Sequence, residues 1–256
     1  MEQFDFGTAT ILFTDVDDTL TTDGQLRSET YQALWRLAQA NVAVVPVTGG
    51  CAGWCDQIIR TWPVSAVIGE GGAFYISKDA DKKLHWSFWD TREQHKIDQA
   101  NIISDVQSMA EGDGIVFAKD QPFRLVDVAI DYNQDHRMAP EQVASIMLQL
   151  ENLGYRVKKS SIHLNISKGN FDKSTMALRL GEQLFGLTAA ELSQQAICIG
   201  DAPNDESMFS QFPQSVGVAN IVPHLDTMTH KPAYVTSERC GGGFVQLADH
   251  WLSQLQ

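Results

Sequence analysis

Short apolar runs alternate with amphipathic stretches along the N-terminal part of the chain. Runs over residues 9–14, 42–47 and 66–68 are rich in β-branched side chains, which predicts short buried strands. Between the first two runs, apolar residues recur at i, i+3, i+4 and i+7 from Tyr31, which predicts an amphipathic helix. A second helix is expected through residues 53–59. This alternation of strands and helices predicts a parallel sheet with right-handed crossovers.

The pattern becomes less regular after Lys78. Helices are expected over residues 93–110 and 140–153, and strands over residues 124–131 and 162–166. Apolar and polar residues alternate in the last of these strands, which suits a sheet with one solvated face. We interpret this stretch as an inserted α+β unit.

The alternation of strands and helices resumes towards the C-terminus. The expected elements are helices over residues 174–185, 188–194 and 244–255 and strands over residues 196–199, 215–219 and 233–235. The glycine run at 241–243 is expected to precede the last helix. We therefore predict an α/β fold with a Rossmann-like, doubly wound parallel sheet core over residues 1–80 and 166–256. Residues 81–165 are predicted to form the inserted α+β domain.

The composition narrows the range of partners. The chain has 256 residues, of which 43% are hydrophobic, enough for a large core with a smaller inserted unit. It carries 19 basic and 32 acidic residues, a formal net charge of −13. Because nucleic acids and anionic membranes bind basic surfaces, we expect neither as a partner. A small phosphorylated partner stays compatible with this charge, since a bound cation reverses the local field.

The N-terminus and the cysteines predict a cytoplasmic protein. Residues 1–8 lack the basic and apolar regions of a signal peptide, and no run of roughly 18 apolar residues predicts a membrane span. Cys51 and Cys55 have a helical spacing, but no histidine or second cysteine pair supports a metal site there. We expect all the cysteines to be reduced thiols, most of them buried.

An acidic turn directly follows the first predicted strand. Asp15, Asp17 and Asp18 lie within four residues, at the strand end where open α/β sheets bind ligands. Carboxylates so close together repel each other, and a hard cation such as Mg²⁺, which prefers oxygen ligands, relieves the repulsion. The alternative is a solvated turn that caps a helix.

Other polar residues are predicted at the same edge of the sheet. Thr48 and Gly49 come after the second strand, and Asp201 and Asp205 come after the first C-terminal strand. Lys173 lies where a helix is expected to begin. A hydroxyl, an unobstructed backbone N–H group and a lysine all suit the oxygens of a phosphoryl group.

The order of these motifs resembles that of the haloacid dehalogenase-like hydrolases. The two most specific are Asp-Val-Asp-Asp-Thr-Leu at 15–20 and Gly-Asp-Ala-Pro-Asn-Asp at 200–205. The chain looks most like the branch whose α/β cap is inserted between the second and third motifs. That branch includes the Cof-type phosphatases, sucrose-phosphate phosphatase and mannosyl-3-phosphoglycerate phosphatase.

The resemblance implies roles for the acidic residues. Asp15 would be the nucleophile, and Asp17 would be the general acid and then the general base. Mg²⁺ would be bound by the Asp15 carboxylate, the Asp17 backbone carbonyl and Asp201. Asn204 and Asp205 would hold these ligands from a second layer.

The resemblance also implies contacts with the rest of the substrate. Thr48 and Gly49 would bind phosphate oxygens, and Lys173 would place a positive charge against the nucleophile. Lys168, in Ser-Lys-Gly, is the alternative for this lysine. Arg124 is a candidate substrate contact, with a surface arginine on a sheet face as the alternative.

Two positions depart from the family pattern. Gly50 stands where many relatives have an arginine, and Glu70 stands where many have an asparagine. A carboxylate near a phosphate site is unfavourable unless it meets a hydroxyl or a cation. These departures weaken any inference of the substrate from a single relative.

We therefore expect a Mg²⁺-dependent phosphoric monoester hydrolase that forms an aspartyl-phosphate. Its expected substrate is a small phosphorylated metabolite, a sugar phosphate or sugar-acid phosphate, and its expected state is a monomer or homodimer. One alternative is a phosphomutase on the same scaffold, which returns the phosphoryl group to the substrate. Another is a sugar-phosphate-binding protein without turnover.

Overall fold

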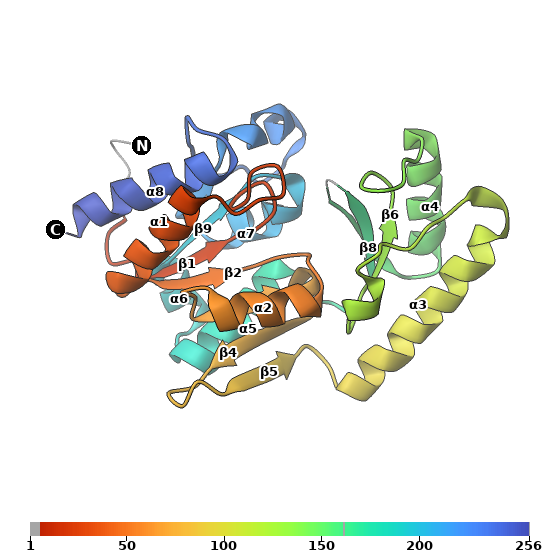
Figure 1. Cartoon of the computed structure of the whole chain (residues 1–256), viewed down its shortest axis with the longest axis horizontal. Helices are drawn as coiled ribbons and strands as arrows, with labels where there is room; N and C mark the ends of the chain where they lie inside the picture. The colour runs from red at the N-terminus through yellow and green to blue at the C-terminus, as the bar shows by residue number, and fades with distance from the viewer. Residues whose placement is uncertain (1–5, 161, 256) are drawn as a thin grey trace.

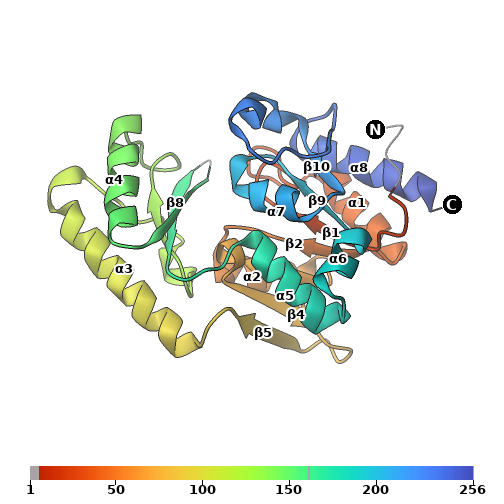
Figure 2. The same cartoon turned by 180° about the vertical axis from the view of Figure 1, so that it is seen from behind.

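The computed structural model describes residues 6–160 and 162–255, except the side chains of residues 110–113. It has two lobes, which we call the core and the cap (Figure 1). The core contains the parallel sheet, and the cap contains a separate antiparallel sheet with two helices. Figure 2 shows the same two lobes from behind.

A parallel sheet of five strands, counted within the described residues, forms the centre of the core. In spatial order its strands are β11 (Tyr234–Val235), β10 (Ser215–Gly217), β9 (Ala196–Gly200), β1 (Ile11–Thr14) and β2 (Ala43–Pro46). The central strand pairs β1–β2 and β1–β9 keep a regular register, in which Leu12 lies beside Val44 and Ile197. This sheet confirms the predicted α/β fold.

Helices cover both faces of the sheet, so the core is doubly wound. One face carries α1 (Ser28–Gln39), α2 (Ala52–Thr61) and α8 (Cys240–Gln254), and the other carries α5 (Lys173–Phe185), α6 (Ala189–Gln195) and α7 (Glu206–Gln211). Successive side chains of a strand point to opposite faces. Accordingly Leu12 packs among the first set of helices and Phe13 among the second.

An antiparallel ribbon continues the core beyond β2. A parallel bridge between Val47 and Ile68 joins β2 to β3 (Ala66–Gly69), which pairs with β4 (Phe74–Lys78) and through it with β5 (Leu84–Phe88). The aromatic side chains of β5 pack against the core cluster. This strand falls within residues 81–165, so the first part of the expected insert belongs to the antiparallel ribbon of the core.

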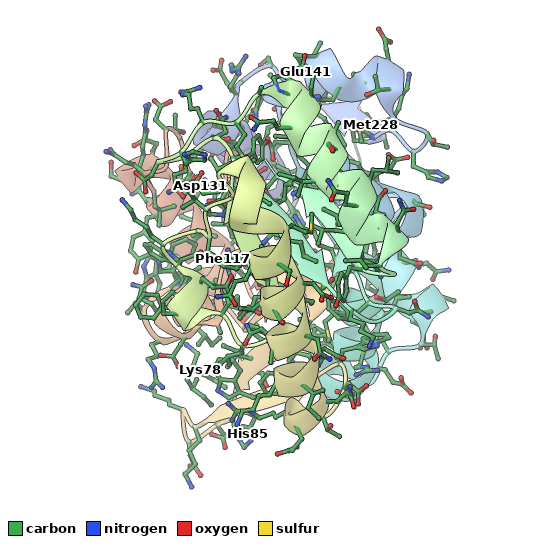
Figure 3. The ribbon with its side chains drawn as sticks, turned by 90° about the vertical axis from the view of Figure 1, so that its right-hand side faces the viewer. Lys78, His85, Phe117, Asp131, Glu141 and Met228 are labelled. Carbon is green, nitrogen blue, oxygen red and sulfur yellow. The ribbon has the colours of Figure 1, made fainter. Side chains whose placement is uncertain are left out.

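The cap is built on an antiparallel sheet with one apolar and one polar face. Its strands follow the order β6 (Val128–Asp131), β8 (His163–Ser167) and β7 (Arg156–Lys159). The helices α3 (Arg92–Asp113) and α4 (Pro140–Asn152) pack on the apolar face, which points away from the core (Figure 3). The polar face is turned towards the core (Figure 1).

The strand expected over residues 124–131 is shorter in the structure. Only Val128–Asp131 pairs as a strand, because the backbone N–H groups of Leu125, Val126 and Asp127 donate to the Glu70 carboxylate. Short 3₁₀ helices occupy the connections, namely η1 (Glu70–Gly72), η2 (Gln121–Phe123), η3 (Pro203–Asp205) and η4 (Ala219–Thr227).

The glycine run was expected to precede the last helix. In the structure it lies inside α8 (Cys240–Gln254). The helix begins at Cys240, so Gly241 and Gly243 belong to its first turn. A Cβ atom on Gly241 would collide with the Thr30 hydroxyl, and one on Gly243 would meet the Glu238 carbonyl oxygen at 2.6 Å. The glycines therefore allow the start of this helix to approach the rest of the core closely.

The four cysteines have free thiols, of which Cys51, Cys55 and Cys198 are buried and Cys240 is half-buried. Within residues 6–160 and 162–255 no helix has both the length and the apolar character that crossing a bilayer requires.

Gly72 lets the start of α5 approach β3. Its φ of +109° belongs to the region that favours glycine, and a Cβ atom there would collide with the Asp172 carbonyl oxygen. Neighbouring Gly71 has a φ of +67° but open space around it. At both positions a residue with a side chain would have an unfavourable backbone conformation. Only at Gly72 would its Cβ atom also collide with a neighbouring atom.

We predict that Gly72→Ala lowers the free energy of unfolding by about 3 kcal/mol or more, and that Gly71→Ala lowers it by only about 1 kcal/mol. Urea denaturation followed by circular dichroism measures both. Equal losses in the two variants would show that the contact with Asp172 contributes nothing.

Candidate active site

A cavity of about 710 Å³ lies between the core and the cap. The carboxyl ends of β1, β2 and β9 form its core side, and β7, β8 and the segment around residue 120 form its cap side. All the site residues predicted from the sequence line this cavity except Asp205, which lies behind it.

Three carboxylates meet at the floor of the cavity and directly behind it. Asp15 follows β1, Asp201 follows β9, and Asp205 lies in η3. These strands are neighbours in the sheet, and the Asp15 backbone N–H donates to the Ile199 carbonyl oxygen at 2.9 Å. One carboxylate oxygen from each of the three residues lies within 4.8 Å of the other two. The cluster is thus a direct result of the parallel strand order.

The Lys173 ammonium lies between two of these carboxylates. Its Nζ is 2.5 Å from Asp15 Oδ1 and 2.6 Å from Asp205 Oδ1, and all three side chains are buried. Burial alone would lower the pKa of Lys173, but the Asp15 and Asp205 carboxylates hold it above its ordinary value. Lys168, the alternative, is exposed and pairs with Asp98 at 3.3 Å.

The electrostatics of Asp15 reflect this crowding. Burial raises the pKa of its carboxyl, the Lys173 ammonium opposes this, and the carboxylates of Asp205, Asp201 and Asp17 raise it further. Together these effects raise the pKa of Asp15 well above its ordinary value, and the contact with the Lys173 ammonium is the one among them that favours the ionised form. An ionised carboxylate can act as a nucleophile without a base.

Asp205 orients the loop after β9. While one of its oxygens accepts from Lys173, the other accepts the backbone N–H groups of Asp201 at 3.0 Å and Ala202 at 3.4 Å. A Cβ atom on Gly200 would collide with this carboxylate, so the approach requires glycine. Asp205 therefore fixes both Lys173 and Asp201.

Asp201 is held by Thr19, a member of the motif at 15–20 to which sequence reasoning gave no role, and by Asn220, which sequence reasoning missed. The Thr19 hydroxyl donates to Asp201 Oδ1 at 3.3 Å, and Asn220 Nδ2 donates to Asp201 Oδ2 at 3.0 Å. The Asn220 side chain also bonds the Asp18 carbonyl oxygen and the Cys240 backbone N–H. Burial and the Asp205 carboxylate raise the pKa of Asp201 to about 7.

The loop after β2 leaves two donors towards the cavity. Thr48 Oγ1 accepts the Gly50 backbone N–H at 2.8 Å, so its own O–H proton remains free to donate. The Gly49 backbone N–H has no hydrogen-bond partner among the described residues. Both groups line the cavity on the same side as Asp15.

Asp17 is open to the cavity. The surrounding protein shields it in part from water, which raises the pKa of Asp17, while the Lys173 ammonium lowers it and Asp18 raises it. A carboxyl with a raised pKa retains its proton closer to neutral pH, as a general acid must.

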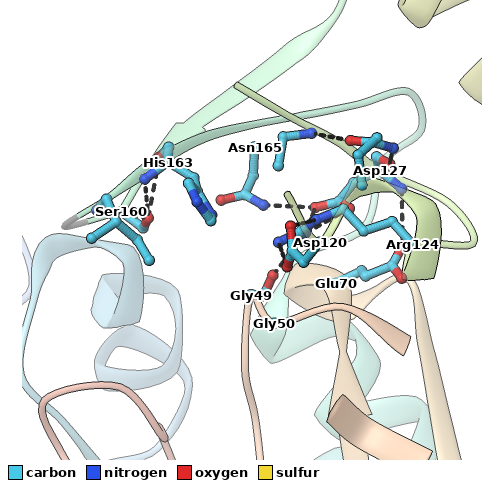
Figure 4. A network of polar contacts seen from close by, with 12 residues as sticks. Gly49, Gly50, Glu70, Asp120, Arg124, Asp127, Ser160, His163 and Asn165 are labelled. Carbon is cyan, nitrogen blue, oxygen red and sulfur yellow. Dashed lines mark hydrogen bonds and ion pairs between the residues drawn. The ribbon is translucent and has the colours of Figure 1, made fainter. Parts of the chain in front are cut away.

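Arg124 is buried and fully engaged within the protein (Figure 4). Its guanidinium donates to Asp120 through Nε and Nη2 at 3.1 and 2.8 Å, and to Asp127 through Nη1 at 2.8 Å. The same Nη1 donates to the Gly49 carbonyl oxygen at 3.1 Å. Arg124 therefore holds the loop after β2 and is not the surface arginine offered as the alternative; because it also lines the cavity, its contact with substrate stays a prediction.

Glu70 explains one departure from the family pattern. It is 2% exposed, and its two oxygens accept four backbone N–H groups at 2.8–3.0 Å, from Ala52, Leu125, Val126 and Asp127. These donors favour the ionised form, although burial and the Asp127 carboxylate raise the pKa of Glu70 to about 8. The carboxylate thus joins α2 of the core to the segment that leads into β6 of the cap.

Residues 8–252, nearly the whole chain, match the family model of sucrose-6F-phosphate phosphohydrolase. The chain belongs to this family. The match confirms the predicted resemblance to haloacid dehalogenase-like hydrolases and the prediction of a phosphatase. No protein with a curated description matches the sequence significantly.

Solved structures of low sequence identity share the fold. A Thermoplasma acidophilum protein is 18% identical with a TM-score of 0.76, and the match covers 98% of this chain and 100% of that one. Sucrose-phosphatase from Synechocystis, solved with sucrose and phosphate, is 15% identical with a TM-score of 0.68, over 96% and 98% of the chains. A haloalkanoate-superfamily phosphatase from Bacteroides thetaiotaomicron is 15% identical with a TM-score of 0.64, over 95% of each chain.

The acidic cluster of this sucrose-6F-phosphate phosphohydrolase family member fits a divalent cation. Three carboxylates share a single ammonium, so negative charge remains in a buried place. In addition Asn204 Oδ1, which is buried beside the cavity, has no hydrogen-bond partner among the described residues. Mg²⁺ prefers oxygen ligands, and carboxylate and amide oxygens of this kind suit it.

We predict that Glu70→Gln lowers the free energy of unfolding by about 2 kcal/mol, because an amide nitrogen would face buried N–H donors. The matched control is Glu206→Gln. Glu206 accepts two backbone N–H groups through one oxygen near the surface, so the amide oxygen can replace it and the change should stay within about 0.5 kcal/mol. Urea unfolding measures both, and equal stabilities of the two variants would contradict the role of Glu70.

Proposed function

We propose that this protein is a Mg²⁺-dependent phosphatase that hydrolyses a small phosphorylated metabolite through an aspartyl-phosphate on Asp15. The observation that carries the proposal is the Asp15 carboxylate itself. It is buried at the cavity floor, held by Lys173 and adjacent to Asp201. A solvated acidic turn, the alternative for this stretch, has no such partners.

In the first step a carboxylate oxygen of Asp15 attacks phosphorus, and the bond between phosphorus and the ester oxygen breaks. Asp17, which lies open to the cavity, donates its proton to the leaving alcohol. In the second step the Asp17 carboxylate takes a proton from a water that attacks the aspartyl-phosphate. Inorganic phosphate leaves, and Asp15 returns to its starting state.

The remaining residues bind and orient the phosphoryl group. The Thr48 hydroxyl and the Gly49 N–H would donate to its oxygens, and Lys173 would balance its charge while keeping Asp15 in line. Asp205 keeps Lys173 in place from behind.

Mg²⁺ would be held by the carboxylates of Asp15 and Asp201 and the backbone carbonyl of Asp17, with Asn204 and Asp205 around them. When bound, it neutralises the repulsion between the Asp15 carboxylate and the phosphoryl oxygens. Thr19 and Asn220 orient the Asp201 carboxylate for this task.

A sugar phosphate is the substrate class we propose. The family name and the sucrose and phosphate in the Synechocystis structure support it. The size of the cavity also supports it, since about 710 Å³ leaves room for a leaving group beside the phosphoryl group. Release of inorganic phosphate distinguishes this function from a phosphomutase, which forms an isomer without net release.

We predict that Asp15→Asn lowers phosphate release from p-nitrophenyl phosphate by at least roughly 10³-fold, because the amide is no nucleophile. Asp23→Asn is the control, since Asp23 is exposed and forms only a 3.6 Å ion pair with Arg27. Its rate should equal that of the wild type. Retained turnover in a folded Asp15→Asn variant would refute the role of the nucleophile.

We also predict that a chelator abolishes phosphate release and that added Mg²⁺ restores it. Asp201→Asn should raise the Mg²⁺ concentration needed for half-maximal activity by tenfold or more, because a carboxylate ligand becomes neutral. Magnesium titrations of the initial rate test this expectation. Full activity in excess chelator would exclude the proposed metal.

A further inference from the structure

Among the described residues that line the cavity, six are basic, and only one has no partner within the protein. Five are engaged: Lys119 with Asp135, Arg124 with Asp120 and Asp127, Arg156 with the carbonyl oxygens of Gly169 and Phe171, Lys159 with the Tyr132 ring, and Lys173 with Asp15 and Asp205. The sixth is Lys158, for whose ammonium the structure records neither an ion pair nor a hydrogen bond among these residues.

The register of the cap sheet turns Lys158 towards the core. In the β7–β8 pair Lys158 lies opposite Asn165, and Val157 lies opposite Ile166. Val157 and Ile166 pack with α3 and α4, so Lys158 and Asn165 share the other face. On that face Asn165 Nδ2 bonds Asp127 at 2.8 Å, and Asn165 Oδ1 lies 4.0 Å from where a Cβ atom of Gly49 would be.

The side chain of Lys158 is exposed, and the charges around it act in both directions. Desolvation by the surrounding protein lowers the pKa of Lys158, the carboxylate of Asp172 raises it, the positive charges of Arg156 and Lys173 lower it, and Asp205 raises it. An anion beside Lys158 would offset the repulsion by Arg156 and Lys173. Lys158 thus offers an unused positive charge on the cap side of the cavity, opposite the Asp15 floor.

We infer that Lys158 binds a second anionic group of the substrate, a carboxylate or a phosphate on the leaving group. This inference rests on the proposed phosphatase function and narrows its substrate class to sugar phosphates with an additional negative charge. The polar neighbours Asn165 and Ser167 on the same sheet face suit the hydroxyl groups of such a molecule. The net negative charge of the chain disfavours an additional anionic group on the substrate, so a dedicated cation is needed to bind that group.

The test compares substrates that differ by one anionic group. The pair 6-phosphogluconate and glucose 6-phosphate adds a carboxylate, and the pair fructose 1,6-bisphosphate and fructose 6-phosphate adds a phosphate. We expect the wild-type protein with Mg²⁺ to have a lower KM for the more anionic member of at least one pair, and this pair identifies the group.

Lys158→Met should raise the KM for the more anionic member about tenfold, the effect of losing one charge-assisted contact, and leave the KM for the less anionic member within about twofold. Lys158→Arg should retain the preference. Lys96→Met removes the same charge from an exposed site on α3 outside the cavity and should change neither KM.

The outcomes separate the two proposals. If the wild type shows no preference in either pair, or Lys158→Met changes both members equally, the inference about Lys158 is wrong while the phosphatase function stands. If the wild type releases no phosphate from any of these compounds or from p-nitrophenyl phosphate, the proposed function itself is wrong, and the inference falls with it.

Discussion

The contact of the Lys173 ammonium with Asp15 and Asp205 is the interaction on which the rest of the site depends. Two carboxylates and one ammonium are buried together, and burying any one of them alone would be very costly. Each of these residues comes from a different part of the chain, so the core must be fully assembled before the charges can meet. Gly72 lets the backbone at Asp172 come close, and Gly200 lets the Asp205 carboxylate come close, so both glycines allow the three charged groups to meet. Stability and chemistry therefore share the same contacts.

A second buried carboxylate connects the two lobes. Glu70 satisfies N–H groups from α2 and from the segment that precedes β6, and Arg124 in that segment reaches back to the Gly49 carbonyl oxygen. The four donors around Glu70 satisfy both of its buried oxygens. The residue that departs from the family pattern thus has a structural role, because the asparagine of many relatives has only one acceptor oxygen for these N–H groups.

The sequence predicted the architecture well because strand ends and helix starts leave local patterns. The sequence predicted the strands before Asp15 and Asp201 and the helix that begins near Lys173. Because β1 and β9 are parallel neighbours, their carboxyl ends bring Asp15 and Asp201 together. Thr19 belongs to the motif at 15–20, but its bond to Asp201 was not foreseen, and Asn220 could not be found in this way, since a single amide outside any motif carries no local signal. The engagement of Arg124 was also hidden, because Asp120 and Asp127 lie on an irregular turn. The catalytic roles themselves stay predictions.

Three of the four hydrogen bonds of Glu70, those from Leu125, Val126 and Asp127, have a mechanical consequence. They pin the cap along the edge next to β6, whereas β7 lies at the opposite edge of its sheet. A swing of the cap about this edge would move β7 farthest, and Arg156, which ties β7 to the segment before α5, would set the range of that movement. Lys158 lies on β7, so a substrate whose leaving group carries a second anionic group would draw this strand towards the core, and binding of the leaving group would also close the cavity.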